Sequence, residues 1–573
     1  MRGIIDELRE TELESLRSEV KAGRARHYLK SLDERGAAQV LIRQQYSGRY
    51  LFELLQNAND AAAESGRGGK VRFQLTDEAL LIADNGVGFQ REHIEAICTL
   101  GRSSKSAAKS IGYKGLGFKA VGEITDRPQV VSGQVSFEFD ANRALESVLD
   151  IAGRLEAQQR IPTYAFPFVV DPDGLGSDAG AVNLLRELGF TTVMRFPFRK
   201  DVDRAVVAQQ LKDSIQPSLM LFLRSVEQLE VSGTEADFSS TVVREPDGPA
   251  ERVLLETDGG VTEWLVHARQ IAVEPEWITN MEAAWKNVKE VSVAIATPLD
   301  DSSLPSSEHT FPLHVYFPTV EKSAFPVIMH ADWALQLDRT QLSTAPESRR
   351  YNQELTTQLV SLLSEVVGPD LALRYPGTSA APRALTPQGA PTGAGAVVFD
   401  ACVQALRDVR FLPTQNGAVC SPAEAKLLPN TVPSPTGAHA FCDLADTPAL
   451  VSAEVEEESA VREFLAQVMK TPALSDMYVM NRLRAPAQPD STDYYNFLLA
   501  WDNSVGRHNF VRLLRDVKCI STNAGDVVTP SSRVFFRRKS EAIEISAELP
   551  LPIAGSGFRW FRGSAETGRC PGF

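Results

Sequence analysis

The spacing of apolar residues along the first 100 positions changes from helical to strand-like. Residues 1–30 predict a charged helix with a modest apolar stripe, and residues 38–65 predict a stronger helix. Two short strands follow, KVRFQL at 70–75 and ALLIA at 79–83, and a Gly-rich turn comes directly after the second. A helix is expected from about 91 to 100. We therefore expect a mixed α/β domain here.

The alternation continues beyond a loop that is rich in Ser, Lys and Gly and ends near Gly117. Residues 129–200 alternate apolar and polar positions around a polar helix and end in the strand-like TTVMRFPF. A second α/β unit follows, with several expected strands and a final helix near 350–367. The expected divisions are an N-terminal helical segment, a first domain, a middle domain, a linker or mobile loop rich in Pro, Ala, Gly and Thr, and a C-terminal α+β region, at 1–37, 38–202, 203–374, 375–397 and 398–573.

An internal repeat lies in the last region. LRDVRFLPTQNGAVCSP at 406–422 recurs as LRDVKCISTNAGDVVTP at 514–530, with the LRDV tetrapeptide and four further positions in common. Each copy predicts a strand, a polar turn with Gly and a second short strand. The repeat therefore favours two duplicated structural hairpin modules over one catalytic domain.

Composition and charge narrow the class of protein. The chain has 573 residues, a net charge of −15, and six cysteines without a CxxC pair. Scattered cysteines favour a reducing cytoplasm, and the sequence has no apolar run long enough for a membrane helix. The acidic balance disfavours broad nucleic-acid binding, because phosphate contacts need a basic surface. We expect a cytoplasmic protein, and the ending at GRCPGF leaves open a fragment of a longer chain.

Three polar side chains share one face of the helix at 38–65. Glu53, Asn57 and Asp60 are spaced i, i+4 and i+7, and the apolar side chains occupy the other side. A carboxylate can deprotonate water, and an amide oxygen is a hard ligand for Mg²⁺. An ordinary amphipathic surface helix explains the same spacing, so this segment alone leaves both interpretations open.

Two Gly-containing segments offer backbone to a ligand. Asp84 in DNGVGF can accept a hydrogen bond from an exocyclic amine, and Gly86 and Gly88 allow close approach to a flat ring, although DNG is also a common hairpin turn. GYKGLGFK at 112–119 leads into a helix, where free N–H groups suit a phosphate. GxxGxG alone is a weak signal, and neither a P-loop nor a Rossmann fingerprint is present.

In this order and spacing, the three segments resemble the GHKL ATPases, whose nucleotide lies in a Bergerat α/β sandwich. The resemblance implies that Glu53 is the general base, Asn57 binds Mg²⁺ and Asp84 reads the adenine amine. Histidine kinases lack a carboxylate four residues before the Asn, so Glu53 favours hydrolysis. Thr192 matches a second adenine contact, although Thr191 precedes it where the family often has Gly. The implied ATP-binding residues are Asn57, Asp60, Asp84, Gly86, Gly88, Gly101, Ser103, Lys105, Gly112, Gly115, Leu116, Gly117, Phe118 and Thr192.

Two longer segments resemble the sacsin-type, heat-shock-ninety-like branch of these ATPases. They are YSGRYLFELLQNANDA at 46–61 and LHVYFPTVEKSAFPVIMHADWALQLDRTQL at 313–342. The second implies a transducer-like middle domain, with Arg339 as the basic residue that reaches the terminal phosphate. The alternative for Arg339 is a structural ion pair, with Asp338 as the obvious partner.

The resemblance implies an ATP-driven, Mg²⁺-dependent switch in which a lid at about 100–117 orders when ATP binds. A homodimer through the ATPase domain is a further expectation. Three outputs stay open: a chaperone-like ATPase acting on protein clients, a nucleic-acid-linked ATPase of a bacterial genome-defence (antiviral) system, and a nucleotide-binding scaffold with negligible turnover. No membrane partner is expected.

Overall fold

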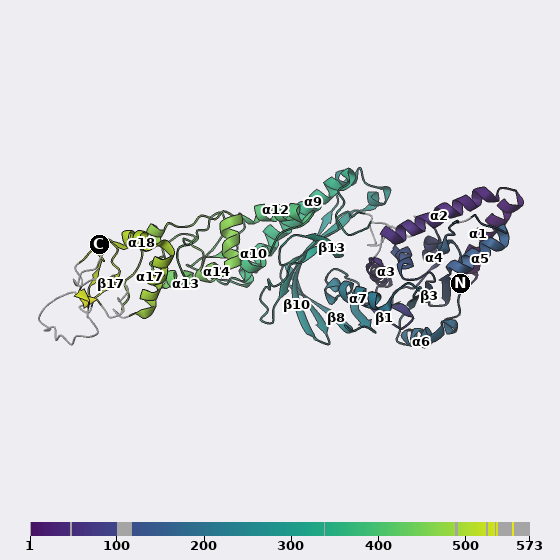
Figure 1. The fold of residues 1–573 in the computed structure, drawn as a ribbon, viewed down its shortest axis with the longest axis horizontal. Coiled ribbons are helices and arrows are strands. Elements are labelled where there is room, and N and C mark those ends of the chain that lie inside the picture. The colour runs from purple at the N-terminus through teal and green to yellow at the C-terminus, as the bar shows by residue number, and fades with distance from the viewer. Residues whose placement is uncertain are drawn as a thin grey trace.

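The computed structural model describes residues 2–45, 48–99, 117–156, 158–336, 338–487, 491–522, 525–532, 535–536 and 553–554. The fold is mixed α/β, and Figure 1 shows an elongated arrangement with the N-terminal helices at one end and the C-terminal helices at the other. No helix in these ranges is long and apolar enough to cross a membrane.

The N-terminal third contains seven of the α-helices formed by the described residues. They are α1 (Arg2–Lys21), α2 (Ala25–Gln45), α3 (Tyr50–Ser65), α4 (Arg91–Cys98), α5 (Ala141–Ala152), α6 (Ala179–Glu187) and α7 (Arg204–Ser214). The expected helices at 1–30 and 38–65 are therefore divided differently: Gly23 and Gly48 have positive φ angles of 70° and 76°, which end helical geometry before α2 and α3. The stripe of α1 is buried through Ile5, Leu13 and Leu16, and Leu13 and Leu16 pack with residues of α5 and its neighbours.

One mixed sheet runs through both expected domains. Fourteen strands of the described chain form it. In spatial order they are β13 (Phe317–Lys322), β12 (Pro312–Val315), β14 (Ile328–Ala331), β11 (Glu290–Leu299), β10 (Gly260–Ala272), β9 (Ala250–Thr257), β8 (Phe238–Asp247), β7 (Val226–Ser232), β1 (Gly69–Leu75), β2 (Ala79–Asp84), β6 (Thr192–Pro197), β3 (Gln129–Ser132), β4 (Val135–Phe139) and β5 (Pro167–Val169).

The parallel pair β1–β7 joins the two halves of this sheet. Val71 lies opposite Leu229 and Phe73 opposite Val231, whereas every other neighbour of β1 and β7 in the sheet is antiparallel. One hydrophobic core continues across the junction, since residues of α3, β1 and β2 pack with residues 219–231. The expected boundary at 202/203 therefore falls inside a continuous sheet and a shared core.

The middle part of the sheet buries both faces. Along β11, Val291, Val293 and Ile295 pack on the core that includes α9 (Pro346–Leu362), α10 (Gly368–Arg374) and α12 (Gly395–Leu406). Ala294 and Ala296 point the other way, into the core shared with the N-terminal domain. This alternation follows from the two-residue period of a strand. Figure 1 shows α9 and α12 on one face of the middle part of the sheet and α3 on the other.

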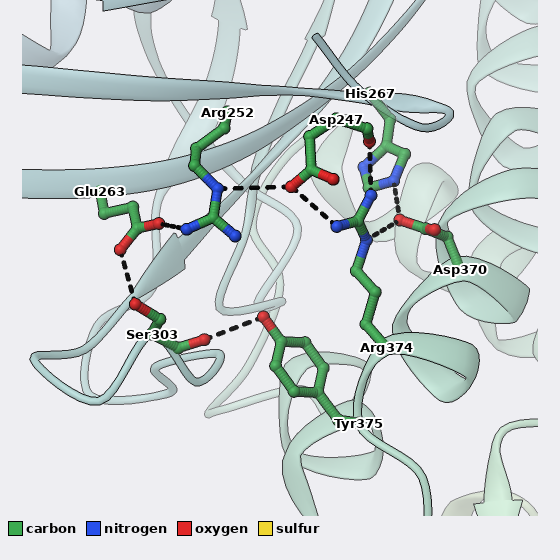
Figure 2. Close-up of polar contacts among 8 residues, drawn as sticks. All are labelled: Asp247, Arg252, Glu263, His267, Ser303, Asp370, Arg374 and Tyr375. Carbon is green, nitrogen blue, oxygen red and sulfur yellow. Dashed lines mark hydrogen bonds and ion pairs between the residues drawn. The ribbon is translucent and has the colours of Figure 1, made fainter. Parts of the chain in front are cut away.

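A polar network ties the middle sheet to α10 (Figure 2). Arg374 Nε lies 2.6 Å from Asp370 Oδ2, and its Nη1 lies 2.8 Å from Asp247 Oδ2 in β8. His267 Nε2 of β10 lies 2.8 Å from the same Asp370 oxygen, and burial lowers the pKa of this imidazole. Arg252 pairs with Asp247 and Glu263. The network is structural in character, since it fixes where α10 leaves the sheet.

Residues 375–397, expected as a linker or mobile loop, pack against the middle sheet. α11 (Ala380–Ala384) lies within this segment, and Ala381 and Leu385 are buried in the same core as α9. The backbone of Gln388 donates to Ala324 O at 2.6 Å. The segment shows no clear apolar period because it is rich in small residues and proline. The same small side chains let its backbone lie close to the sheet.

The C-terminal repeat forms two hairpins with the same register. β15 (Leu412–Pro413) pairs with β16 (Val419–Cys420), and β17 (Ile520–Ser521) pairs with β18 (Val527–Val528). Gly417 and Gly525 occupy equivalent turn positions, with φ angles of 79° and 84°. A helix precedes each hairpin, α12 and α18 (Arg507–Leu514) respectively. The remaining helices are α8 (Pro275–Ile278), α13 (Pro435–Phe441), α14 (Ala453–Glu457), α15 (Ser459–Glu463), α16 (Asp476–Met480) and α17 (Thr492–Val505).

Candidate functional site

Helix α3 separates an apolar side from a polar side, as the sequence predicts. Leu51, Leu54, Leu55, Ala58 and Ala62 are each at most 2% exposed. The helix ends at Gly66, whose left-handed φ of 65° lets its N–H bond to Ala63 O. The apolar side anchors α3 in the core, and the polar side is left to meet other parts of the chain.

Arg339 contacts the polar side of α3. Its Nη1 lies 2.6 Å from Glu53 Oε1 and donates to Gln56 Oε1 at 3.0 Å, although Gln56 and Arg339 are 283 positions apart in sequence. The side chains of Arg339 and Glu53 are 11% and 5% exposed. Asp338, the alternative partner, instead accepts hydrogen bonds from the N–H and hydroxyl of Thr340.

The backbone at Arg339 is unusual for a non-glycine residue. Its φ is +56°, in the left-handed region, and its N–H donates to Gln336 O at 3.0 Å in a tight turn. Left-handed geometry costs a residue with a Cβ about 1 kcal/mol or more, so it persists where the surroundings enforce it. Here the buried contact with Glu53 and Gln56 holds the guanidinium in place.

Two further contacts join α3 and its N-terminal end to the start of β13. Arg49 Nη1 donates to Pro318 O at 3.2 Å, and its guanidinium lies 5.0 Å from the ring centre of Phe52. The Phe52 ring is in turn 4.9 Å from the ring of Phe317. The middle domain therefore packs on α3 through apolar, aromatic and charged contacts together.

Asp84 ends β2 and is almost fully buried. Its carboxylate accepts from Gly86 N at 3.0 Å, and only 5% of the residue is exposed. Burial raises the pKa of this carboxyl to about 7, against the smaller opposing effect of the Gly86 N–H. A buried carboxylate with few donors is suited to an external N–H donor such as an exocyclic amine.

Gly86 and Gly88 are the points where this segment meets its neighbours. A Cβ on Gly86 would stand 2.5 Å from Ala61 Cβ and 2.7 Å from the Ala61 backbone. Gly88 has a φ of +75°, and a Cβ there would lie 3.0 Å from Ser132 Oγ. Val87 N donates to Ala61 O at 3.3 Å, so the turn is held directly against α3.

Thr192 lies beside Asp84 in the sheet. The two residues are directly opposite in the β2–β6 pair, and Thr192 is 1% exposed. Its hydroxyl is 2.8 Å from Ser132 Oγ, which also accepts from Phe89 N at 2.9 Å. Sequence reasoning missed Ser132, because a single Ser in a predicted strand carries no signal until its partners are known.

The polar side of α3 borders a cavity of about 430 Å³. Glu53, Gln56, Asp60 and Arg339 line it, and the opposite wall comes from the middle sheet. Gln56 is 1% exposed, and its Nε2 has no hydrogen-bond partner within the described residues. Sequence reasoning missed Gln56, although its place three residues after Glu53 put it on the same side of the helix.

Asn57 lies at the edge between the cavity and the Asp84 turn. It is half-buried and does not line the cavity. At about 100° per residue, Asn57 falls between Glu53 and Ala61, the residue that contacts Gly86. The described residues contain no cluster of three His, Cys, Asp or Glu side chains able to hold a metal ion. A cation here would therefore depend on the Asn57 amide, water and a ligand's own oxygens.

The expected phosphate loop is described only at its end. Gly101, Ser103, Lys105, Gly112, Gly115 and Leu116 lie outside the described residues. Gly117 begins the 3-10 helix Gly117–Glu123. The Phe118 ring packs 6.0 Å from Tyr164 in the core, so only its backbone amide is free to serve a ligand.

Lys119 is a buried base beside this loop. It is 2% exposed, and its Nζ donates to Thr99 O at 2.8 Å. Burial lowers the pKa of this amine to about 8. The contact between Lys119 and Thr99 connects the two described ends of the loop. The sequence did not indicate this contact.

Two comparisons with known proteins bear on the site. The family model described as Sacsin domain matches residues 38–244, a range that includes α3, the Asp84 turn and Thr192. The chain is also similar to Protein NO VEIN of Arabidopsis thaliana, with 25% identity over 344 residues. That match covers 58% of this chain and 12% of the plant protein, so the chain spans only a small part of that relative's length. The sacsin-type likeness is thus supported for the first domain.

Proposed function

We propose that this chain binds ATP with Mg²⁺ and hydrolyses it, in a Bergerat-type domain that works with a transducer-like middle domain. The observation that carries the proposal is the meeting of Glu53 and Arg339 at 2.6 Å. A candidate base and a candidate phosphate-binding cation, from segments far apart in the sequence, lie in one buried place.

The residues around Asp84 fit the adenine end of the nucleotide. Asp84 supplies a buried acceptor, and Gly88 leaves a space that a Cβ would restrict against Ser132. Gln56 supplies a buried N–H donor that lacks a partner in the described chain, which fits a phosphate oxygen. Mg²⁺ held by Asn57 would neutralise phosphate charge when bound.

In the proposed reaction, Glu53 orients the attacking water and accepts its proton. Arg339 offsets the negative charge that develops on the phosphoryl group. Arg339 belongs to the loop after β14, in the middle domain. Nucleotide binding at α3 therefore changes the contact of Arg339 with Glu53 and Gln56, which joins the middle domain to α3. The proposed output is an ATP-driven conformational switch, chaperone-like in its use.

A nucleotide-binding scaffold with negligible turnover is the second candidate. It is favoured by the same ion pair, because a carboxylate oxygen held 2.6 Å from a guanidinium is occupied by that contact and is not open to an attacking water. The two candidates differ in whether Arg339 leaves Glu53 when nucleotide arrives, so kinetics separate them.

The test measures ATP affinity and steady-state phosphate release for the wild type, Glu53→Gln and Asp84→Asn. Glu53→Gln should keep binding and lower turnover by about 10²-fold or more, since general-base catalysis contributes about that much. Asp84→Asn should lose ATP binding. Glu64→Gln, an exposed change on the same helix, is the matched control and should behave as wild type.

The outcomes divide the candidates. Tight binding with equal turnover in wild type and Glu53→Gln would support the scaffold and contradict the catalytic role. A wild type that binds no ATP would contradict both.

A further inference from the structure

The wall of the cavity opposite α3 is aromatic and acidic. Its residues belong to β14, the turn after β12, the loop after β14 and α9, and to neighbouring segments. The aromatic side chains that line it include Phe222, Trp285, Tyr316, Phe317, Trp333 and Tyr351. Asp332 and Glu290 are carboxylates at this wall, and 19% of the Asp332 side chain is exposed.

The backbone pairing of Asp332 uses one of its oxygens, and the Tyr316 side chain is a further hydrogen-bond partner of this carboxyl. Oδ2 accepts from Ser292 N at 2.8 Å, while the Asp332 N–H donates to Ser292 O at 3.1 Å. These two bonds extend the β11–β14 pairing. Oδ1 lies 3.7 Å from His330 Nε2, beyond hydrogen-bond distance.

No cation of the described chain neutralises Asp332. Its only ion-pair neighbour there is His330, and burial lowers the pKa of this imidazole to about 3, so the ring is neutral. Three arginines line the cavity: Arg339 contacts Glu53 and Gln56, Arg49 donates to Pro318 O, and Arg224 lies 3.7 Å from Glu251 Oε2. Burial also raises the pKa of Asp332 to about 6, as expected for a carboxyl without a counter-charge.

The aromatic side chains of this wall pack against one another in pairs. The Tyr316 ring lies 4.8 Å from the His330 ring, and the Trp285 ring lies 4.9 Å from the Tyr351 ring. Burial raises the pKa of the Tyr316 phenol, and the charge of Asp332 and a hydrogen bond with the Asp332 side chain raise it further. Aromatic faces beside a carboxylate form the usual surroundings of a bound ammonium or guanidinium group.

We propose that this wall of the cavity binds an organic cation, with Asp332 as the counter-charge and Tyr316 and its neighbouring aromatic rings as the enclosing surface. The chemistry is that of a lysine or arginine side chain of a protein segment, or of a free polyamine. A volume of about 430 Å³ is in the range of small-ligand sites. The net charge of −15 favours the approach of a cation. The site shares its cavity with Glu53, Gln56 and Arg339, but Asp332 and Tyr316 have no part in the proposed ATP hydrolysis, so cation binding can be measured without nucleotide.

The test is calorimetric titration of the full chain without nucleotide, at about physiological ionic strength so that diffuse charge effects are screened. The probes are spermidine and three capped pentapeptides that differ only in a central lysine, arginine or norleucine. Binding of spermidine alone would support the site with a free amine as its source, and binding of the lysine or arginine peptide would support a side chain. Binding of no cationic probe, or equal binding of the norleucine peptide, would overturn the proposal.

Variants locate the site. Asp332→Asn keeps an oxygen for Ser292 N but removes the charge, and affinity should fall at least about tenfold. Tyr316→Leu removes the ring and should weaken binding about fivefold, which keeps the test valid if Asp332→Asn does not fold. Asp301→Asn, a change at an exposed carboxylate outside the cavity, should bind as wild type. Unchanged affinity in both Asp332→Asn and Tyr316→Leu would overturn the assignment.

Discussion

At the scale of single residues, the site depends on charges that are buried in pairs or left nearly alone. Glu53 and Arg339 form a pair with little exposure, so each offsets the desolvation cost of the other. Among the described residues, the Gly86 N–H is the one group that offsets the burial of the Asp84 charge. The pKa of Asp84 is raised to about 7 for this reason, and this has a measurable consequence for stability.

We predict that Asp84 makes the folded chain less stable as pH rises. Its folded pKa of about 7 exceeds the ordinary value of 3.8, so the folded state holds the proton more tightly than the unfolded state. The free energy of unfolding should therefore fall between about pH 4 and pH 7, with a slope of up to about 1.4 kcal/mol per pH unit. Asp84→Asn should lack this slope in urea unfolding measured from pH 5 to pH 8.

The quantity to compare is the free energy of unfolding of Asp84→Asn minus that of the wild type, because other buried acids titrate in both proteins and cancel in this difference. The free energy of unfolding of Asp84→Asn, relative to the wild type, should increase up to about pH 7 and level off above it. Asp77→Asn, at a fully exposed side chain, should show no pH-dependent difference. A constant difference for Asp84→Asn would show that the carboxyl keeps an ordinary pKa.

At the scale of elements, the position of α3 determines the site. Its apolar side fixes it in the core, Ala61 holds the Asp84 turn, and Glu53 and Gln56 meet Arg339. Periodicity predicted the polar and apolar sides of this helix correctly. Periodicity does not predict the break before Tyr50, nor the change after α7 to the 3-10 helix Pro217–Leu221, where Pro217 interrupts helical hydrogen bonding.

We predict that Gly86→Ala separates α3 from the Asp84 turn. The added Cβ would meet the Ala61 side chain and backbone at 2.5–2.7 Å, and backbone cannot move aside cheaply. The free energy of unfolding should fall by about 1–3 kcal/mol, and ATP affinity should fall with it. Denaturant unfolding and nucleotide titration would measure the two effects.

Gly180→Ala is the matched control. It lies in α6, where an added Cβ meets nothing within 4 Å, so the change should be neutral or stabilise by about 0.5–1 kcal/mol. Equal effects of the two substitutions would mean that the close approach at Gly86 is not important for stability.

At the scale of the whole molecule, the continuous sheet joins domains that the sequence suggested were separate. The parallel β1–β7 pair and the shared core cross the expected boundary at 202/203. The Sacsin domain match ends at 244, inside β8, and therefore also extends past that boundary to include β7. The unit that folds together is larger than the one that composition indicated.

We predict that a fragment of residues 1–202 does not fold cooperatively, whereas a fragment of residues 1–234 does. The shorter fragment leaves the β1 edge unpaired and removes buried residues such as Leu221 and Leu229 from the core. The longer one restores both. Thermal unfolding followed by circular dichroism should give a sharp transition only for residues 1–234. A sharp transition for residues 1–202 would show that the first domain is independent of β7.

The sequence by itself determined the local features: the amphipathic α3, the strands that flank the Asp84 turn, and the paired C-terminal hairpins. These depend on side-chain period and turn residues, which are properties of short segments. The sequence also indicated Arg339 as a candidate, but through the resemblance of residues 313–342 to the sacsin-type branch and not through any local pattern. Only the tertiary structure decided that Arg339 lies on Glu53, that residues 375–397 pack against the sheet, and that Asp332 forms no ion pair with an arginine or lysine of the described residues. Those features depend on which segments distant in sequence meet, and a period of two or 3.6 residues carries no information about that.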